Sequence, residues 1–378
     1  MNERVKSVVG IAAAYTGTLF GAGFVSGQEI LRFFAAWGGL GILGALLAGA
    51  GFAALGAAVT AIARRKETSD YERVISPFGG IVPKLIEALM SVWLFGIVTV
   101  MLAAAGDLFH ALTGLPPLAG AALLGAAVVT VNLLGAEGFT RALSAVVPVM
   151  IAVGFGTAAA GVFTGPDAAF ASSPAPELAV APSFLVSAAL YISYNILGCI
   201  GVLAPLGRKA AHGKDARLGV ILGGIVPGLF AALLCAAMLR NRMTAVSNDM
   251  PMFAIARAIS PALGVVYAAA LFLGIFTAAS GIAFSLLSRL QSYKLPGILG
   301  KRAFLVSAVC AAALAGSRLG FASLVGAVYP AYGWLGFAAI ALMAINCFRA
   351  RKLKQTAAGE DEAAARGLQK QEDAHEFH

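Results

Sequence analysis

The chain has 378 residues, of which 60% are hydrophobic and 12% are charged, and its mean hydropathy is +0.86. A soluble globular domain carries about 25% charged residues, so this composition excludes a soluble fold and predicts an all-α polytopic membrane protein. The net charge of +9 does not indicate a nucleic-acid partner, because the basic residues fall in short segments between apolar runs. In that position they act as an orientation signal.

Ten apolar segments are predicted to cross the bilayer as helices. They cover residues 8–35, 39–63, 84–112, 117–134, 142–163, 184–206, 218–239, 262–288, 303–316 and 322–348. With the N-terminus in the cytoplasm, most of the 27 Lys and Arg residues fall on the cytoplasmic side; the exceptions are Arg32, Arg240, Arg242, Arg257 and Arg318. This asymmetry predicts that both termini are cytoplasmic.

Glycines crowd the first span, and two charged side chains follow them. The glycines are Gly17, Gly21, Gly23 and Gly27, and the charged residues are Glu29 and Arg32. Glycines this dense weaken a helix, and non-helical backbone at membrane depth survives only where protein buries it or a wet cavity adjoins it. Ionisable groups inside a span are costly and mark functional sites. The sequence therefore predicts a broken first helix at a solute or ion site.

Some segments outside the spans also have distinctive sequences. Residues 69–75 and 249–257 are predicted to form short helices, the second beginning near a proline and serving as an outer lid. Residues 164–182 contain four prolines and are predicted to be an extended linker. Residues 355–378 are polar and poor in aromatic residues, which indicates a disordered tail.

The sixth span repeats the features of the first. It carries a polar cluster near its middle and then two glycines, namely Tyr191, Ser193, Tyr194, Asn195, Gly198 and Gly201. Glycine-interrupted segments at matching positions of two halves indicate a transporter site, because broken helices expose N–H and C=O groups at the midplane. We therefore predict a 5+5 inverted repeat with broken helices 1 and 6. Its parts are a first repeat (1–163), an outer linker (164–182), a second repeat (183–348) and a C-terminal segment (349–378).

Two stretches resemble the YkvI-type bacterial membrane proteins. They are Gly-Ala-Gly-Phe-Val-Ser-Gly-Gln-Glu-Ile at 21–30 and Tyr-Ile-Ser-Tyr-Asn at 191–195, and the resemblance extends over most of 1–350. It implies membership of the amino acid–polyamine–organocation group, with the leucine-transporter fold, in a bacterial inner membrane. It also implies a solute between spans 1, 3, 6 and 8, and spans 1, 2, 6 and 7 that rock against 3, 4, 8 and 9. It implies no particular substrate.

In sodium-coupled members of that group, one ion lies between the first break and span 8. The resemblance therefore implies a Na⁺ site made by carbonyls near Gly17 and Phe20 and by the hydroxyls of Thr277 and Ser280. These two hydroxyls lie three residues apart, on one helix face. The register across the glycines leaves the carbonyls of Ala22 and Val25 as alternatives.

Protons are the alternative coupling ion, and they would bind Glu29. Some proton-coupled relatives place a lysine in span 5, but residues 142–163 contain no ionisable side chain. Some sodium-coupled members carry adjacent hydroxyls in span 8, and this chain does not. The choice between Na⁺ and H⁺ therefore stays open at the level of sequence.

The candidate solute contacts surround the two expected breaks. They are Gly21, Gly23, Ser26, Gly27, Gln28, Glu29, Tyr191, Tyr194 and Asn195. Glu29 is a carboxylate well inside a span and is predicted to bind a cation, a solute amine or a proton; alternatively, it pairs with Arg32 three residues further on. Arg32 and Asp249 are candidates for a gate.

Together these features predict a secondary active transporter of a small organic solute, an amino acid or related amine, that works by alternating access coupled to Na⁺ or H⁺. A passive facilitator or channel and a solute sensor on a transporter fold are the alternatives. The sequence shows no catalytic motif, no metal-ligand spacing among its four cysteines and no nucleotide-binding loop, so neither enzymatic activity nor a cofactor is predicted. The expected partners are the solute and the lipid bilayer, and the oligomeric state is left open.

Overall fold

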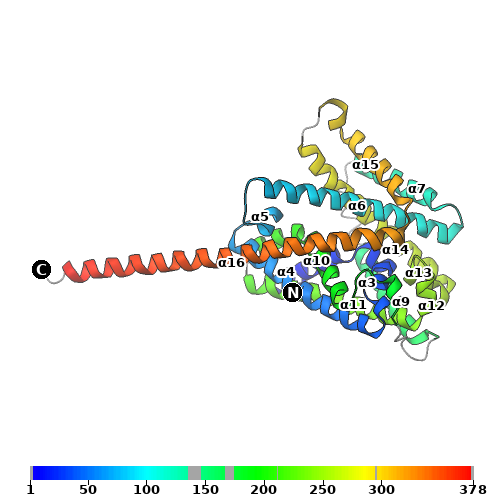
Figure 1. Ribbon diagram of the computed structural model, residues 1–378, viewed down its shortest axis with the longest axis horizontal. Helices are drawn as coiled ribbons and strands as arrows, with labels where there is room; N and C mark the ends of the chain where they lie inside the picture. The colour runs from blue at the N-terminus through cyan, green and yellow to red at the C-terminus, as the bar shows by residue number, and fades with distance from the viewer. Residues whose placement is uncertain (1–2, 135–145, 167–173, 211, 294–295, 376–378) are drawn as a thin grey trace.

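The computed structural model describes residues 3–134, 146–166, 174–210, 212–293 and 296–375, and every regular element within these ranges is a helix (Figure 1). The first half contains α1 (Glu3–Leu19), α2 (Ala22–Ser26), α3 (Gln28–Phe33), α4 (Gly39–Arg65), α5 (Tyr71–Ile75), α6 (Ile81–Thr113), α7 (Pro117–Leu134) and α9 (Val146–Thr164). The second half contains α10 (Phe184–Lys209), α11 (Gly213–Arg240), α12 (Arg242–Val246), α13 (Pro251–Ile259), α14 (Pro261–Ser292), α15 (Arg302–Ser317) and α16 (Phe321–His375). Short 3₁₀ turns lie at Ala35–Trp37, Pro176–Leu178 and Gly297–Gly300.

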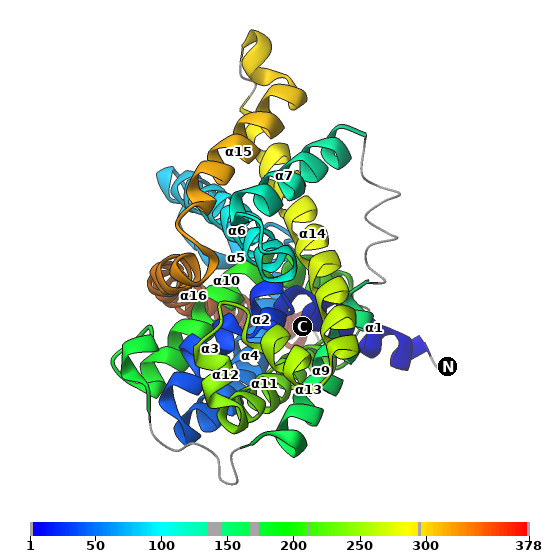
Figure 2. The ribbon, with the colours of Figure 1, turned by 90° about the vertical axis from the view of Figure 1, so that its right-hand side faces the viewer.

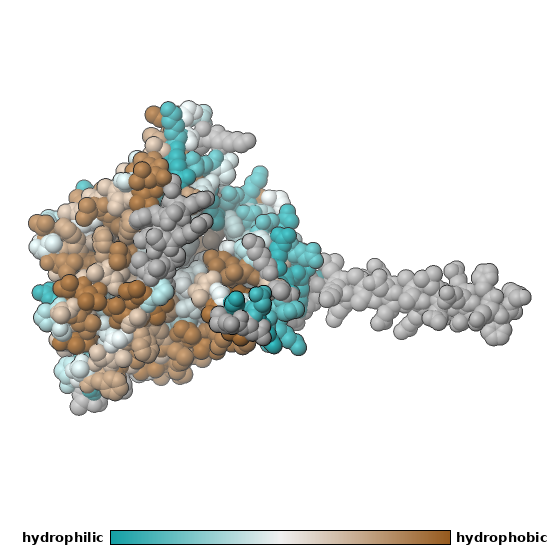
Figure 3. Space-filling model, turned by 180° about the vertical axis from the view of Figure 1, so that it is seen from behind, coloured by the Kyte–Doolittle hydropathy of each residue, from teal (hydrophilic) through white to brown (hydrophobic). Residues whose placement is uncertain are grey.

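The helices reproduce the predicted spans. Among the described residues, α4, α6, α7, α10, α11, α14 and α16 are each long and apolar enough to cross a membrane. The apolar helices α9 and α15 are shorter, and α1, α2 and α3 together form an interrupted first span. Residues 142–145 of the fifth predicted span lie outside the described ranges. Apolar side chains cover much of the surface, and polar ones gather where the C-terminal helix leaves the molecule (Figure 3).

Eight of these helices form two packed groups (Figure 2). In the first, here called the bundle, α1 and α4 both pack against α10 and α11. In the second, here called the scaffold, α6, α7, α14 and α15 pack against one another. The bundle therefore contains spans 1, 2, 6 and 7, and the scaffold contains spans 3, 4, 8 and 9. Between the groups, α9 packs against α11 and α14, and α16 packs against α10 and α6.

Glycines allow the second spans of the two halves, α4 and α11, to approach closely. A side chain at Gly228 would collide with the backbone of Gly49, and one at Gly224 would lie 2.5 Å from the backbone nitrogen of Ala53. Small residues at such crossings are typical of membrane helices, because in lipid the association depends on close van der Waals packing. Close packing of α4 on α11 thus holds the two repeats together inside the bundle.

Two short helices predicted outside the spans are confirmed. The segment expected at 69–75 forms α5, and the segment expected at 249–257 forms α13, which begins at Pro251. Of the linker at 164–182, residues 167–173 lie outside the described ranges, and the 3₁₀ turn at Pro176–Leu178 follows them.

Helix 6 differs from the prediction, because α10 runs without a break from Phe184 to Lys209. Gly198 and Gly201 are accommodated within this helix, where each glycine costs about 1 kcal/mol relative to alanine. The packing of α10 against α1, α4 and α16 offsets that cost. Only the first span is therefore interrupted among the described residues, and helix 6 contributes side chains rather than open backbone.

The C-terminal segment also differs, because α16 continues as a helix to His375 where a disordered tail was expected (Figure 1). Residues 350–375 are rich in Ala, Glu, Gln, Lys and Arg. These are strong helix formers, and their intrinsic preference extends the helix even without an apolar face to bury.

Candidate functional site

The first span is interrupted twice. Helix α1 ends at Leu19, and the N–H of Gly21 bonds to the Leu19 carbonyl at 3.0 Å instead of continuing the helical ladder to Gly17. Gly21 is extended, with φ −83° and ψ 168°, and α2 begins after it. At the second interruption Gly27 has φ +87°, a left-handed conformation that favours glycine. The predicted break between Gly21 and Gly27 is thereby confirmed.

The second interruption places Glu29 in the first turn of α3, where its side chain is 5% exposed. The hydroxyl of Tyr194 on α10 donates a 2.7 Å hydrogen bond to Glu29 Oε2, and Tyr329 on α16 also hydrogen-bonds to this carboxylate. The rings of Tyr194 and Tyr329 stack with centroids 5.1 Å apart and planes inclined by 7°. The carboxylate is therefore positioned by side chains from two other spans.

Glycine at position 23 makes this arrangement possible. A Cβ atom at Gly23 would overlap Oε1 of Glu29 and would lie 2.9 Å from its carboxyl carbon. The break thus does two things: it turns Glu29 inward, and it leaves an empty place on α2 for the carboxylate.

A cavity of about 210 Å³ lies against Glu29, between the bundle and the scaffold. Its walls come from the first span, α6, α10, α14 and α16, that is from spans 1, 3, 6, 8 and 10. Three aromatic rings face one another there, with the Trp93 centroid 5.9 Å from Tyr194 and 6.0 Å from Tyr329. Asn195, Gly198 and Gly21 also line the cavity. This volume is suited to a molecule of a few heavy atoms rather than a drug-sized ligand.

The cavity carries a carboxylate without a basic partner. Among the described residues, no Lys, Arg or His nitrogen lies within 4 Å of the Glu29 carboxylate. The alternative in which Glu29 forms an ion pair with Arg32 is therefore not what the structure shows. Arg32 instead lies against Gly326 of α16, where a side chain would collide with its guanidinium.

Gln28 connects the two predicted gate residues. With its amide nitrogen facing the segment before α13, Gln28 donates to the backbone carbonyl of Asp249 at 3.3 Å and accepts from Arg32 Nε at 3.1 Å. The Asp249 side chain is exposed and, together with Asp107, lines a separate hollow of about 810 Å³. Helices α12 and α13, which contribute to this hollow, lie at the end of the molecule opposite the C-terminal helix (Figure 1). We call this hollow the vestibule. Gln28 thus lies between the vestibule and the cavity rather than on the cavity wall.

Other predicted contacts have structural partners of their own. The Ser26 hydroxyl donates to the Gly23 carbonyl at 2.8 Å and accepts from the Gln28 N–H at 3.3 Å, so it satisfies backbone groups freed by the break. Tyr191 packs against Phe34 and Phe33, with ring centroids 4.8 and 5.3 Å away, and does not line the cavity. It supports the tyrosines behind the site instead of touching a solute.

The predicted sodium site stays a prediction. The Thr277 hydroxyl donates to the Leu273 carbonyl of its own helix at 2.7 Å, whereas the Ser280 hydroxyl is buried and has no hydrogen-bond partner among the described residues. The backbone carbonyl of Ser280 accepts from Asn132 Nδ2 at 3.4 Å, and the Phe20 ring packs against Phe24 and Phe230. Helix α14 lines the cavity with Ala278 and Ile282. Of the alternative carbonyls, that of Val25 accepts a hydrogen bond from Tyr267.

Sequence reasoning missed Tyr329. Tyr329 precedes Pro330, inside the last span. A tyrosine beside a proline at membrane depth, far from either interface, was the available signal, because its hydroxyl needs a buried partner.

Residues 69–75, which include the short helix α5, are hydrogen-bonded to both the bundle and the scaffold at the end of the molecule that carries the termini. Arg289 of α14 donates a 2.7 Å hydrogen bond to the Tyr71 hydroxyl, and Arg208 of α10 donates to Ser69 at 3.4 Å. Asn346 of α16 donates to the Val74 carbonyl at 2.8 Å. Burial raises the pKa of Tyr71 to about 12, so its hydroxyl stays protonated at physiological pH.

Comparisons with known sequences place the chain beside bacterial membrane proteins. No family model matches the chain. It is 28% identical over 360 residues to the membrane protein YkvI of Bacillus subtilis (strain 168), covering 93% of this chain and all of that protein. It is 24% identical over 326 residues to the protein YyaD of the same organism, covering 84% of this chain and 90% of the relative.

Comparisons with solved structures identify the fold. The inward-facing conformation of Mhp1 aligns with a TM-score of 0.59 at 17% identity, over 90% of this chain and 75% of that one. A closed Mhp1 with bromovinylhydantoin bound, described as a nucleobase-cation-symport-1 family transporter, gives 0.56 at 16% identity, over 90% and 77%. A manganese transporter of Eremococcus coleocola gives 0.54 at 12% identity, over 91% and 78%. The predicted resemblance to YkvI and the leucine-transporter fold are confirmed.

Proposed function

We propose that this relative of the YkvI-type membrane proteins, built on the leucine-transporter fold, is a secondary active transporter of a small organic amine or amino acid. It would lie in the bacterial inner membrane with both termini in the cytoplasm and work by alternating access. The observation that carries this proposal is the buried Glu29 carboxylate, which faces a cavity and has no basic partner among the described residues.

A buried carboxylate without a counter-charge is costly, so it takes up a positive charge when one is available. A protonated amine supplies that charge and also donates hydrogen bonds to the carboxylate. The Tyr194 hydroxyl would hold Glu29 in position for this contact. The proposed substrate class therefore rests on the negative charge of Glu29 in the cavity rather than on the shape of the cavity.

The aromatic wall favours the same class. Trp93, Tyr194 and Tyr329 surround the space beside Glu29, and ring faces attract cations within about 6 Å of their centroids. A divalent metal ion is less well matched, because no group of three or more His, Cys, Asp or Glu residues is found in the described part of the chain. An ammonium group needs one carboxylate and apolar or aromatic surroundings, which this site provides.

We infer that protons, rather than Na⁺, couple transport at this site. One hydroxyl expected at a sodium site is already engaged, because Thr277 donates to the Leu273 carbonyl of its own helix. Glu29, by contrast, binds one positive charge at a time, so a proton and an ammonium group compete for it. Competition for one carboxylate makes solute binding depend on pH, which is the requirement for coupling to a proton gradient.

Alternating access would arise from motion of the bundle against the scaffold. The cavity lies between them, and Gln28, Arg32 and the Asp249 carbonyl separate it from the vestibule. At the other end, Ser69 accepts a hydrogen bond from α10 of the bundle, and Tyr71 of α5 accepts one from α14 of the scaffold. Opening at either end requires that one of these connections be released.

Accumulation in proteoliposomes tests the proposal. Purified chain is reconstituted, and uptake of labelled methylammonium, choline and neutral amino acids is followed with and without an imposed pH gradient. We expect at least one ammonium compound to accumulate above its equilibrium level under the gradient, and Glu29→Gln to abolish this while Glu87→Gln, a half-buried carboxylate on α6 outside the cavity, retains it. Uptake that only equilibrates would indicate a passive facilitator and overturn the proposal.

A further inference from the structure

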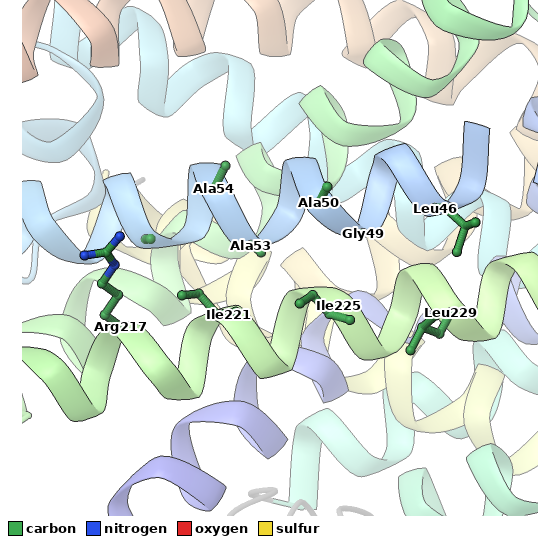
Figure 4. Close-up of a pocket in the computed structure, with 10 residues that line it drawn as sticks. Leu46, Gly49, Ala50, Ala53, Ala54, Arg217, Ile221, Ile225 and Leu229 are labelled. Carbon is green, nitrogen blue, oxygen red and sulfur yellow. The ribbon is translucent and has the colours of Figure 1, made fainter. Parts of the chain in front are cut away.

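A groove of about 520 Å³ runs along the outside of the bundle, between α4 and α11 (Figure 4). Its floor is made of small residues of α4, among them Gly49, Ala50 and Ala54. Ile225 and Leu229 of α11 form one wall, and they are 39% and 56% exposed. The groove faces away from the cavity and therefore toward lipid in a membrane.

Arg217 closes one end of the groove, and its side chain extends from α11 toward α4 (Figure 4). It is exposed, and among the described residues it has neither a hydrogen bond nor an ion pair. The neighbouring charges are already engaged: Arg64 donates to the Ala210 carbonyl, and Asp215 pairs with Arg4 at 2.7 Å. The groove thus combines an apolar channel with one free positive charge.

The length of the groove suits part of an acyl chain. From Leu46 to Ala57 the groove follows α4 for about 16 Å, at 1.5 Å per residue. The hydrocarbon core of a bilayer is about 30 Å thick, so the groove covers roughly half of that thickness, along the middle of α4. Arg217 lies in the second turn of α11, which begins at Gly213, and so at the end of the groove nearer to the headgroups on that side.

We propose that this groove binds one acyl chain of an anionic phospholipid, whose phosphate is held by Arg217. A hollow on a lipid-facing surface must be filled by acyl chains, since an empty one forfeits van der Waals contacts on one side. A guanidinium without a protein partner binds a phosphate through paired N–H donors. At one end, Arg217 selects a lipid with an anionic headgroup. Along the rest of the groove, the small residues of α4 leave room for the acyl chain.

A second copy of the chain fits this surface less well. Small residues spaced by four, such as Ala50 and Ala54, are also found where membrane helices dimerise. A two-fold axis perpendicular to the bilayer would place the two Arg217 side chains at the same depth, facing each other across the interface. Two like charges at such a contact repel each other, whereas a phosphate neutralises one of them.

Native mass spectrometry of the full chain tests this assignment with phosphatidylglycerol and phosphatidylcholine of identical acyl chains. We expect the wild type to retain phosphatidylglycerol preferentially, and Arg217→Gln to reduce this preference about fivefold, the effect of one basic residue at an anionic surface. Lys214→Gln is the matched control: it removes an exposed charge one turn earlier on α11 that does not line the groove.

A second pair of variants tests the acyl-chain groove. Ala54→Leu places a larger side chain on the exposed floor and should lower retention of both lipids, whereas Ala126→Leu, at an exposed position on α7, should not. An unchanged phosphatidylglycerol preference in Arg217→Gln would overturn the proposal. So would a wild-type dimer that Ala54→Leu separates into monomers, because the groove would then be the interface between two copies.

Discussion

The carboxylate of Glu29 occupies the space that a side chain at Gly23 would need, since a Cβ there would overlap Oε1 of Glu29. Residues six positions apart are brought together because the helix is interrupted at Gly27, whose φ is +87°. The glycine-rich motif therefore does more than weaken a helix: it makes room for the charged group of the site.

Gly23→Ala should displace Glu29 from Tyr194 and weaken the binding of an ammonium ligand about tenfold or more. A hydrogen bond to a charged group contributes about 1.5–3 kcal/mol, and about 1.4 kcal/mol corresponds to a factor of ten. Isothermal titration calorimetry of purified variants measures the change. Gly10→Ala is the control, because a Cβ at Gly10 meets nothing within 4 Å. Equal affinities in the two variants would refute the steric relationship.

Binding of the solute should weaken as the pH falls, because protonation of Glu29 removes the negative charge that attracts an ammonium group. In Glu29→Gln the residual binding should no longer depend on pH. Tyr71 cannot account for such a dependence: burial raises its pKa to about 12, so its hydrogen bond to Arg289 persists through neutral and moderately alkaline conditions. The measurement is a set of binding isotherms at pH values between 5 and 8, made for the wild type and for Glu29→Gln. A pH-dependent Glu29→Gln variant would contradict this role.

Gln28→Leu should open the site toward the vestibule, because leucine fills a similar volume but cannot join Arg32 to the Asp249 carbonyl. Cys199 lines the cavity and is 1% exposed, so its alkylation reports access. We expect an impermeant thiol reagent, added from the vestibule side to a chain with Cys199 as its sole cysteine, to react faster in Gln28→Leu. Asn248→Ala should react at the wild-type rate, since Asn248 lines the vestibule and its amide donates to the Thr244 carbonyl of the preceding turn. No acceleration in Gln28→Leu would argue against the gate.

Much of the architecture was predictable, because the bilayer allows few solutions for an apolar chain. The spans, the interrupted first helix, α5 and α13 all followed from hydropathy, glycines and proline. The intact helix 6 did not follow, since local glycine content cannot reveal that α10 is packed on several sides. Tertiary packing outweighs a cost of about 1 kcal/mol per glycine.

The candidate site was predictable in part. Glu29 stood out as a carboxylate within an apolar run, and Tyr194 as a midspan tyrosine. Their mutual contact and the second tyrosine, from α16, depend on how distant spans rotate about their axes. Sequence spacing fixes which residues share a helix face, but not which neighbour that face meets.

Gly228→Ala should destabilise the protein by about 1–3 kcal/mol, the cost of forcing extra volume into a packed contact. A Cβ at Gly228 would collide with Gly49, where α4 and α11 cross. The apparent melting temperature in detergent should fall relative to that of Gly201→Ala, because a Cβ at Gly201 meets nothing within 4 Å. Equal melting temperatures would show that this crossing does not limit stability.

The central claim is that the Glu29 cavity recognises the ammonium group of a small solute. The most direct measurement is a thermal-shift screen of small amines and amino acids against the wild type and Glu29→Gln, with and without Na⁺, since a ligand that binds the folded state raises its apparent stability. The account predicts that stabilising compounds carry an ammonium group, act independently of Na⁺ and lose their effect in Glu29→Gln. Compounds that stabilise both proteins equally, or that require Na⁺, would contradict it.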